Sequence, residues 1–259
     1  MDESWLSVAD AARELELSPG RVRSLLDSGA LHGRKLGGSW FVDPQAVQRR
    51  SAHSGKGGRP LSPGNAWLLL ALLTALPRPD AGLSPADQAR LFSEAQLRLP
   101  ANPVDRSRLR KLLADLPEPE GLARRLASRA KVRRMRAHPG VLDRLQADDR
   151  VSVGGGRAVA ALGGGLAAGG SIRLYVPAAD VDALVRKYRL RDDIEGNIEL
   201  AVIPEDVNAE LRPEQGRPVP LAVAWADLLD DPDARARGAA HDWAARLPRT
   251  VSIPDGRKR

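Results

Sequence analysis

The sequence predicts an α+β protein with an N-terminal winged helix-turn-helix, a helical middle segment and a C-terminal mixed α+β domain. Three observations predict this class. Apolar residues recur at helical spacing in residues 7–27, and two short strands joined by a glycine pair follow at 31–42. Helical segments broken by prolines extend from residue 63 to 135. From residue 141 onward, apolar strands alternate with amphipathic helices.

The first element of the winged helix is a pair of short helices. Apolar residues occupy one face of the first helix, which begins after the N-cap candidate Ser7. Ser18 and Pro19 begin the second helix, because serine caps a helix and proline fits its first position. Its buried face is formed by Val22, Leu25 and Leu26, and Gly29 is expected to end it in a left-handed conformation.

A wing and a closing helix follow. Gly37–Gly38 provides a two-residue turn that tolerates positive φ, so the residues on either side predict a hairpin. Asp43 and Pro44 then begin a third short helix through Val47. Residues 1–50 therefore predict a winged helix-turn-helix DNA-binding domain.

Residues 5–50 resemble the excisionase/MerR-like DNA-binding domains. The two helices correspond to "LSVADAARELELSPGRVRSLLDSGAL", and the wing and closing helix correspond to "GRKLGGSWFVDPQAV". The resemblance implies that the second helix enters the major groove and that the wing contacts phosphate or the minor groove. Gly20 departs from the larger polar residue of many relatives, which removes one implied base contact. The implied DNA contacts are Ser18, Arg21, Arg23 and Ser24 in the helix, and Arg34, Lys35, Ser39 and Trp40 in the wing.

The physical chemistry of these residue types agrees with DNA binding. Arginine can bind guanine O6 and N7 with two hydrogen bonds in the major groove, and wing cations supply salt-dependent affinity for phosphate. The alternative is a winged helix that makes protein contacts only.

Residues 51–65 are rich in Gly, Ser and Pro and predict a flexible linker, before a helical segment at 66–140. This segment ends in a basic run that has no acidic residue between Gly121 and Gly140. Two interpretations stay open, a solvated helix face and a site for nucleic acid or an acidic protein. The cations of the run are Arg124, Arg125, Arg129, Lys131, Arg133, Arg134 and Arg136.

Residues 141–259 predict an α+β domain that serves protein interaction or effector binding. Strands are expected at 150–153, 171–176, 197–203 and 219–229, and helices at 177–190 and 231–247. The glycine-rich stretch 154–170 lacks the Gly-Lys-Ser/Thr of a phosphate-binding loop and indicates turns around a short helix. Asp192, Asp193 and Glu195 indicate an exposed turn.

No enzyme, cofactor or metal is expected. The four histidines are too far apart in the sequence to indicate a metal site, and no serine–histidine–acid set is apparent. They are His32, His53, His138 and His241. The chain contains no cysteine, which excludes disulfides, cysteine-ligated zinc and a thiol nucleophile.

Charge and hydropathy set the remaining expectations. The formal net charge is +7; residues 61–140 carry 14 Lys and Arg against 7 Asp and Glu, whereas residues 141–259 carry 17 against 19. This asymmetry indicates a polyanionic partner, with a GC-rich genome as the alternative source of arginine. The apolar run Ala66–Leu76 is shorter than the roughly 20 residues of a membrane span, and the acidic N-terminus is unlike a signal peptide. We expect a cytoplasmic protein that does not enter a membrane.

A second resemblance covers residues 60–246. The phrases "GRPLSPGNAWLLLALL", "RMRAHPGVLDRLQADDRVSVGG", "IRLYVPAADVDALVRKYRL" and "VPLAVAWADLLDDPDARARGAAHDW" resemble the actinobacterial AbiEi-like antitoxins of type IV toxin–antitoxin systems. That resemblance implies an antitoxin and autorepressor that binds double-stranded operator DNA and opposes a co-encoded nucleotidyltransferase toxin. The usual winged helix of that family differs from the excisionase-like one here. The alternative function is a stand-alone transcription factor or recombination accessory protein, whose C-terminal domain senses a ligand or forms a homodimer.

Overall fold

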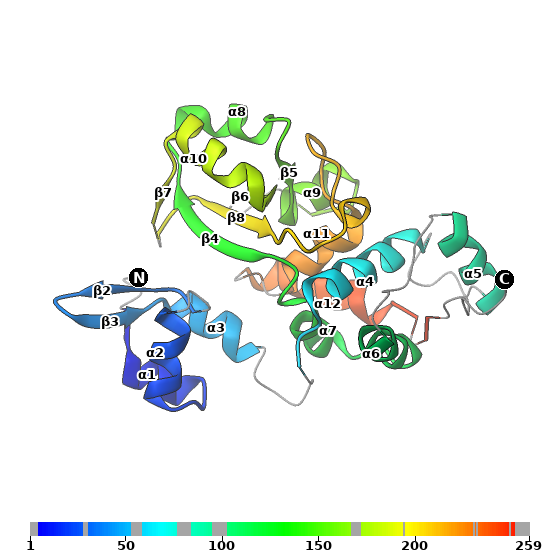
Figure 1. The fold of residues 1–259 in the computed structure, drawn as a ribbon, viewed down its shortest axis with the longest axis horizontal. Coiled ribbons are helices and arrows are strands. Elements are labelled where there is room, and N and C mark those ends of the chain that lie inside the picture. Colours follow the sequence, from blue (N-terminus) through cyan, green and yellow to red (C-terminus); the bar gives the residue numbers. More distant parts are fainter. Residues whose placement is uncertain are drawn as a thin grey trace.

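The computed structural model describes residues 5–27, 31–52, 59–76, 84–94, 103–166, 172–193, 195–229, 231, 233–248 and 250–251. It confirms the α+β class, with a small three-stranded sheet in the front of the chain and a five-stranded sheet in the rear (Figure 1). The predicted helix end at Gly29 lies outside the described residues. None of the described helices has the length and apolar character needed to cross a membrane.

The winged helix has the predicted order of elements and one additional strand. Its helices are α1 (Val8–Glu14), α2 (Pro19–Asp27) and α3 (Pro44–Ala52), and its strands are β1 (Leu6–Ser7), β2 (Gly33–Leu36) and β3 (Ser39–Val42). Strand β1, which the sequence did not indicate, pairs with β3 to give the order β1-β3-β2. Gly37 and Gly38 have φ of 55° and 84°, so the hairpin turns as the glycine pair predicts.

The winged helix has a hydrophobic core of its own. Its buried residues come from α1, α2 and α3 and from the segment between Leu31 and Val42. Gly33 permits the close approach of β2 to α2, because a Cβ atom there would meet Leu26 and lie 2.6 Å from the carbonyl oxygen of Phe41.

The second half of the expected linker is packed against the rest of the chain. The backbone N–H of Leu61 donates to the carbonyl oxygen of Arg125, and the guanidinium of Arg125 donates to the carbonyl oxygen of Arg59. Leu61 is buried, and helix α4 (Pro63–Ala75) already begins inside the expected linker. Residues 53–58 lie outside the described part of the chain.

The middle segment is helical only as far as residue 126. The helices are α4, α5 (Pro85–Glu94), α6 (Pro103–Ala114) and α7 (Pro119–Leu126). The apolar run in α4 is buried on nearly every face, which is the pattern of a central core helix. The expectation of helix through residue 135 is wrong, because Lys131–Arg136 forms strand β4 between β8 and β7. The basic run hid this strand, because it replaces the usual alternation of apolar and polar residues.

The rear sheet has the order β5-β6-β8-β4-β7. Its strands are β4, β5 (Ser152–Val153), β6 (Ile172–Pro177), β7 (Arg191–Asp192) and β8 (Ile198–Ile203); β6 and β8 are parallel, and the other pairs are antiparallel. The helices of this region are α8 (Leu142–Gln146), α9 (Gly155–Ala161), α10 (Val181–Tyr188), α11 (Leu221–Leu228) and α12 (Ala234–Ala245), with short 3₁₀ turns η1 (Pro139–Val141), η2 (Ala178–Asp180) and η3 (Ala209–Leu211).

One predicted strand is a helix. Residues 219–229 were expected to form a strand, but Leu221–Leu228 is α11, which follows Pro220 and is buried along most of its length. Periodicity cannot separate a fully buried helix from a buried strand, and the alanines of this segment favour the helix.

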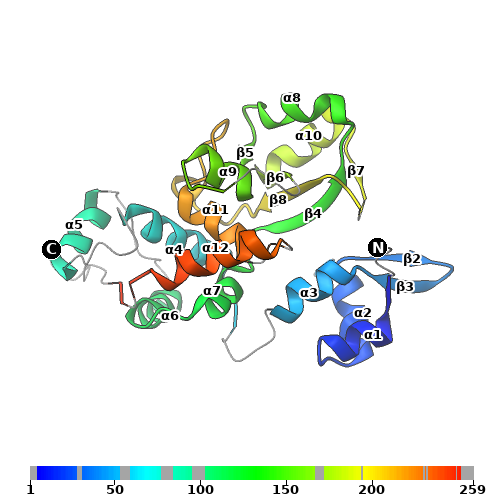
Figure 2. The ribbon, with the colours of Figure 1, turned by 180° about the vertical axis from the view of Figure 1, so that it is seen from behind.

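The two faces of the rear sheet are covered by different helices (Figures 1 and 2). Helix α10 and Leu145 of α8 pack on the face that carries Met135, Leu174 and Leu200. Helices α4, α9 and α11 pack on the opposite face, where Trp67 makes an edge-to-face contact with Tyr175. Trp225 and Trp243 stack where α11 meets α12.

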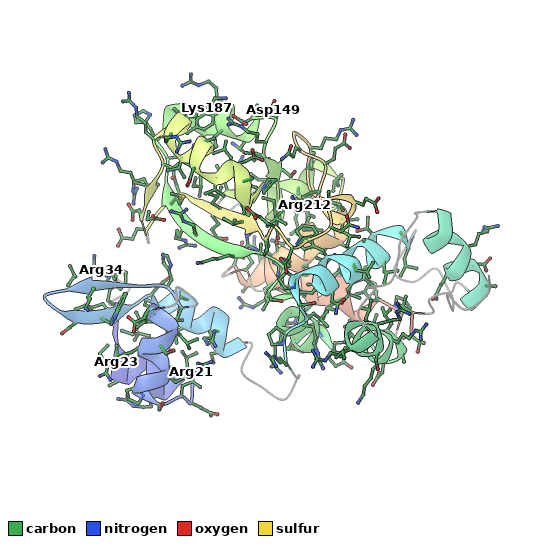
Figure 3. The ribbon with its side chains drawn as sticks, in the orientation of Figure 1. Arg21, Arg23, Arg34, Asp149, Lys187 and Arg212 are labelled. Carbon is green, nitrogen blue, oxygen red and sulfur yellow. The ribbon has the colours of Figure 1, made fainter. Side chains whose placement is uncertain are left out.

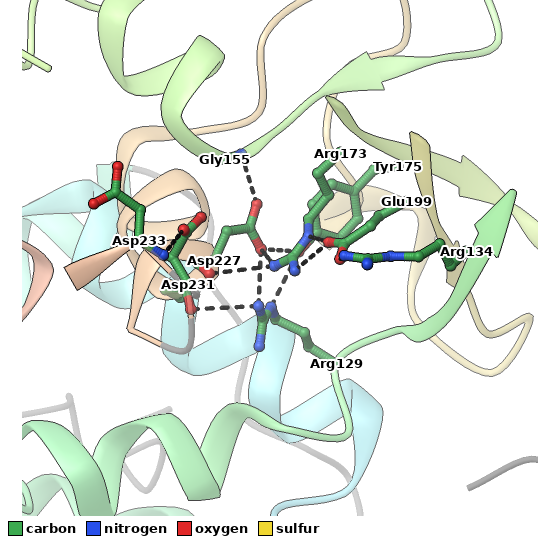
Figure 4. Close-up of polar contacts among 10 residues, drawn as sticks. Arg129, Arg134, Gly155, Arg173, Tyr175, Glu199, Asp227, Asp231 and Asp233 are labelled. Atoms are coloured by element: carbon green, nitrogen blue, oxygen red, sulfur yellow. Dashed lines mark hydrogen bonds and ion pairs between the residues drawn. The ribbon is translucent and has the colours of Figure 1, made fainter. Parts of the chain in front are cut away.

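A buried polar network crosses this second face (Figure 4). Glu199 of β8 lies opposite Arg134 of β4 and Arg173 of β6 in the sheet register and forms ion pairs with both. Arg173 also pairs with Asp227 of α11, whose carboxylate accepts hydrogen bonds from Arg129 and from the hydroxyl of Tyr175. The backbone N–H of Gly155, at the start of α9, donates to the other carboxylate oxygen of Asp227 at 2.8 Å.

We predict that Asp227→Asn lowers the free energy of unfolding by about 3–5 kcal/mol, because the change leaves buried guanidinium groups without their full counter-charge. Urea unfolding followed by tryptophan fluorescence measures the loss. The matched control is Asp149→Asn, whose side chain is 96% exposed and which should change stability by less than about 0.5 kcal/mol. Equal effects of the two substitutions would contradict this role of Asp227.

Candidate nucleic-acid interface

The exposed face of helix α2 carries small residues between two arginines. Val22, Leu25 and Leu26 are buried in the winged-helix core, which orients the helix. At about 100° per residue, Arg21 and Arg23 fall on opposite flanks of the exposed face, with Gly20 and Ser24 between them. All four are exposed, and the two arginines project from α2 in Figure 3. A Cβ atom at Gly20 would meet nothing within 4 Å, so the middle of this face is open to a close approach.

Ser18 begins the helix as predicted. Its hydroxyl accepts a hydrogen bond from the backbone N–H of Arg21 at 3.2 Å, which satisfies one of the free donors of the first turn. Ser18 is also exposed. The N-terminal end of α2 is therefore fixed by a cap directly beside the first arginine.

Arg50 adds a cation to this surface that the sequence pattern does not indicate. The residue is half-buried in α3, and its pKa is lowered by burial and by repulsion from Arg21. A guanidinium remains charged at neutral pH despite this shift. An anion bound near the two arginines would relieve their repulsion. The helical spacing within α2 carries no information about a neighbour from α3. Only the tertiary structure therefore shows that Arg50 lies near Arg21.

The wing divides the four predicted residues between two faces. Residues directly opposite each other in an antiparallel pair share a face, and here Arg34 pairs with Phe41, Lys35 with Trp40 and Leu36 with Ser39. Lys35 and Trp40 lie on the face that carries the buried Val42, and Trp40 packs against the core. Arg34 and Ser39 lie on the other face. The structure therefore does not bring the four residues together on one surface.

Trp5 fixes the position of Arg34. The guanidinium carbon of Arg34 lies 4.1 Å from the centre of the Trp5 ring, which is a cation–π contact. Trp5 immediately precedes β1, and the pairing of β1 with β3 brings it to the wing. Arg34 itself is exposed, so its charge is held in one place while it stays accessible to an anion (Figure 3).

The basic run is distributed over several environments. Arg129 and Arg134 are held by Asp227 and Glu199 in the buried network. Arg133 pairs with Asp192 of β7, and Arg136 pairs with Asp193, which directly follows that strand. The absence of acidic residues within the run does not leave these four cations unbalanced, because their acidic partners lie more than 50 residues away in the sequence.

The other three cations of the run differ among themselves. Arg124 is buried in α7, and its Nε and Nη1 atoms have no hydrogen-bond partner in the described part of the chain. The guanidinium of Arg125 binds the backbone at Arg59, and Lys131 is exposed at the start of β4. The run therefore does not form one continuous cationic face.

Comparison with known proteins agrees with the geometry of the front domain. Residues 5–50 match the family model described as a helix-turn-helix domain. No curated protein and no solved structure matches the chain. The match and the exposed arginines of α2 support a DNA-binding regulator.

We predict that Trp5→Ala and Arg34→Ala are coupled in DNA binding, because removing the ring releases the guanidinium that it holds. The expected coupling energy in a double-mutant cycle is about 0.5–1 kcal/mol. Fluorescence anisotropy with promoter DNA measures it. Lys35→Ala is the matched control, because Lys35 lies on the opposite face of the wing, and its effect should add to that of Trp5→Ala. Additivity of Trp5→Ala with Arg34→Ala would show that the stacking contact does not serve DNA binding.

Proposed function

We propose that the protein is a sequence-specific DNA-binding regulator, and that it is the antitoxin and autorepressor of a type IV-like toxin–antitoxin operon. In this role it binds its operator as double-stranded DNA and opposes a co-encoded nucleotidyltransferase toxin. The observation that carries DNA binding is the outward face of α2, with Arg21 and Arg23 beside Gly20 in a domain that matches the helix-turn-helix family. An α-helix fits the major groove, and arginines there can bind guanine with two hydrogen bonds.

The wing is expected to contribute to DNA binding in a different way from α2. Arg34 and Lys35 are exposed cations on a hairpin and are suited to phosphate contacts, which supply affinity without sequence preference. A single winged helix makes few contacts with DNA, so we expect a homodimer or a second DNA contact to raise the affinity.

The rear half supports the antitoxin part of the proposal. It has a separate core and a nearly balanced charge, which suit a protein-binding surface more than a DNA-binding one. The resemblance of residues 60–246 to AbiEi-like antitoxins implies that the partner is a nucleotidyltransferase toxin. The exposed part of the basic run is the proposed contact for an acidic partner or nucleic acid.

A second candidate function is a stand-alone regulator with a ligand-sensing rear domain. A basic hollow beside α10, described below, favours this alternative. The gene next to this one separates the candidates, because a nucleotidyltransferase there favours the antitoxin and an integrase favours a recombination accessory protein.

We predict that Arg21→Ala with Arg23→Ala weakens operator binding by about 1–3 kcal/mol for each contact that reads a base, and relaxes sequence preference. By contrast, Arg34→Ala with Lys35→Ala should weaken binding to all DNA and reduce its dependence on salt. Gel shifts with operator and with scrambled DNA at several salt concentrations distinguish the two effects. Arg13→Ala is the control, because this exposed arginine lies on α1 and pairs with Asp10. Wild-type binding by the α2 double variant would overturn the recognition-helix proposal.

We predict that residues 53–259 fold alone, do not bind the operator and still neutralise the toxin. The fragment begins at residue 53 because residues 59–65 pack against α7 and the start of α4 and should be kept. Residues 1–52 should retain weak, salt-sensitive DNA binding and give no protection. Survival of cells that co-express each fragment with the neighbouring gene measures protection. Protection that requires the winged helix, or a neighbouring gene product that is harmless alone, would contradict the antitoxin proposal.

A further inference from the structure

A basic hollow of about 860 Å³ lies at one end of the rear sheet. It is bordered by the end of β4, the turn η1, helices α8 and α10, and strand β7, which lie together in both views of the fold (Figures 1 and 2). Five positively charged residues line it, and among the described residues no acidic side chain does. They are Arg136, Arg144, Lys187, Arg189 and Arg191. The volume falls within the roughly 300–1,000 Å³ of small-molecule sites.

Three of these cations are unpaired. Arg144, Arg189 and Arg191 are exposed and form no ion pair within the described part of the chain. Three acids near the hollow already have partners, since Asp193 pairs with Arg136, Asp192 with Arg133, and Asp148 with Arg150 and Lys187. Two of the five charges are therefore balanced by ion pairs, and those of Arg144, Arg189 and Arg191 are not, within the described part of the chain.

The fold places these cations together at a cost in stability. Arg191 of β7 lies directly opposite Arg136 of β4, and like charges in that position destabilise a sheet. Arg189, which ends α10, has a left-handed backbone with φ of 51°, where glycine is the usual residue. Both arginines bring a positive charge to the hollow. Arg191 does so at the cost of repulsion from Arg136, and Arg189 at the cost of a strained backbone.

Other contacts fix the floor of the hollow. The hydroxyl of Tyr188 lies 2.9 Å from a carboxylate oxygen of Asp148 and 3.0 Å from the carbonyl oxygen of Arg144, so it joins α10 to α8. The ammonium of Lys187 is held at 2.8 Å by Asp148 and lies over the ring of Tyr188. Pro139 and Val141 add apolar surface to the lining.

We propose that this hollow binds a nucleotide that carries two or more phosphates. Guanidinium groups bind phosphate oxygens with paired, charge-assisted hydrogen bonds, and three unpaired arginines suit a polyphosphate. The apolar surface of Pro139 and Val141 suits the nucleoside. A small ligand can enter a concave site and reach cations from several elements, whereas a DNA duplex is convex and would contact only its rim. The proposal goes beyond DNA binding; it does not rest on the antitoxin role, and it supplies a ligand for the ligand-sensing alternative.

Isothermal titration calorimetry of the full-length protein with ATP, inorganic pyrophosphate and adenosine tests the proposal. ATP should bind, pyrophosphate should bind more weakly, and adenosine should not bind. Arg144→Ala, Arg191→Ala and Arg189→Gly should each lower the affinity for ATP roughly tenfold or more. Arg189→Gly is the sharpest variant, because glycine suits the left-handed backbone and should raise the melting temperature while it removes the charge.

Arg235→Ala is the matched control, because Arg235 is an exposed arginine on α12 that does not line the hollow. It should leave ATP affinity unchanged. The proposal is overturned if ATP gives no binding at millimolar concentration, or if its affinity survives all three hollow variants. It is also overturned if the three variants bind ATP like the wild type but lose binding to a DNA duplex that lacks the operator sequence. That result would make the region a nucleic-acid-binding surface.

Discussion

The rear half depends on the interactions of one buried group, the carboxylate of Asp227. It receives a hydrogen bond from Arg129 after α7, one from Tyr175 of β6 and one from the N–H of Gly155 in α9, and it pairs with Arg173. Arg129 in turn accepts a hydrogen bond at its carbonyl oxygen from the indole of Trp67 in α4. One side chain thus connects α11 with the sheet, with α9 and with the central helix. Burial raises the pKa of Asp227, but Arg173 and Arg129 outweigh it, so the pKa lies below the ordinary value. The stabilisation from this group is present above the ordinary pKa of aspartate and is lost as the pH falls below it.

The same carboxylate explains part of the glycine-rich segment. A Cβ atom at Gly154 would lie 2.7 Å from a carboxylate oxygen of Asp227 and 2.9 Å from the ring of Tyr175. Gly155 has φ of 61° and donates its N–H to Asp227. These two glycines are needed because α9 begins against a buried anion. The sequence excluded a phosphate loop here and predicted turns around a short helix, which agrees with α9 (Gly155–Ala161). It could not show the anion, because Asp227 lies 72 residues away in the chain.

Local sequence rules were sufficient wherever neighbours in the chain decide the structure. The caps at Ser7 and Ser18 and the glycine turn of the wing were predicted because each depends on a few adjacent residues. The errors occur where distant contacts decide. β4 is a strand because its arginines are neutralised by β7 and β8, and α11 is a helix buried by several elements. In the candidate site the sequence identified the exposed arginines of α2, but it could not identify Trp5 or Arg50, since both reach the surface through tertiary packing.

The contrast between the arginines of the chain follows from their partners. In the rear half, Arg129, Arg134 and Arg173 are held by acids in a low-dielectric interior, where each charge is fixed and unavailable to a ligand. In α2 and around the hollow, arginines remain exposed, and Arg191 is even opposed by another arginine. Abundant arginine alone does not indicate a polyanion partner, because most of the basic run is consumed by internal ion pairs. What distinguishes a binding surface is a cation that the fold holds in place without neutralising it. Arg34 over Trp5 meets that condition in the winged helix, whereas Arg189 is an exposed cation at the end of α10, which packs on a separate core. The two halves of the chain therefore present different cations to solvent, which is the basis for proposing different anions as their ligands.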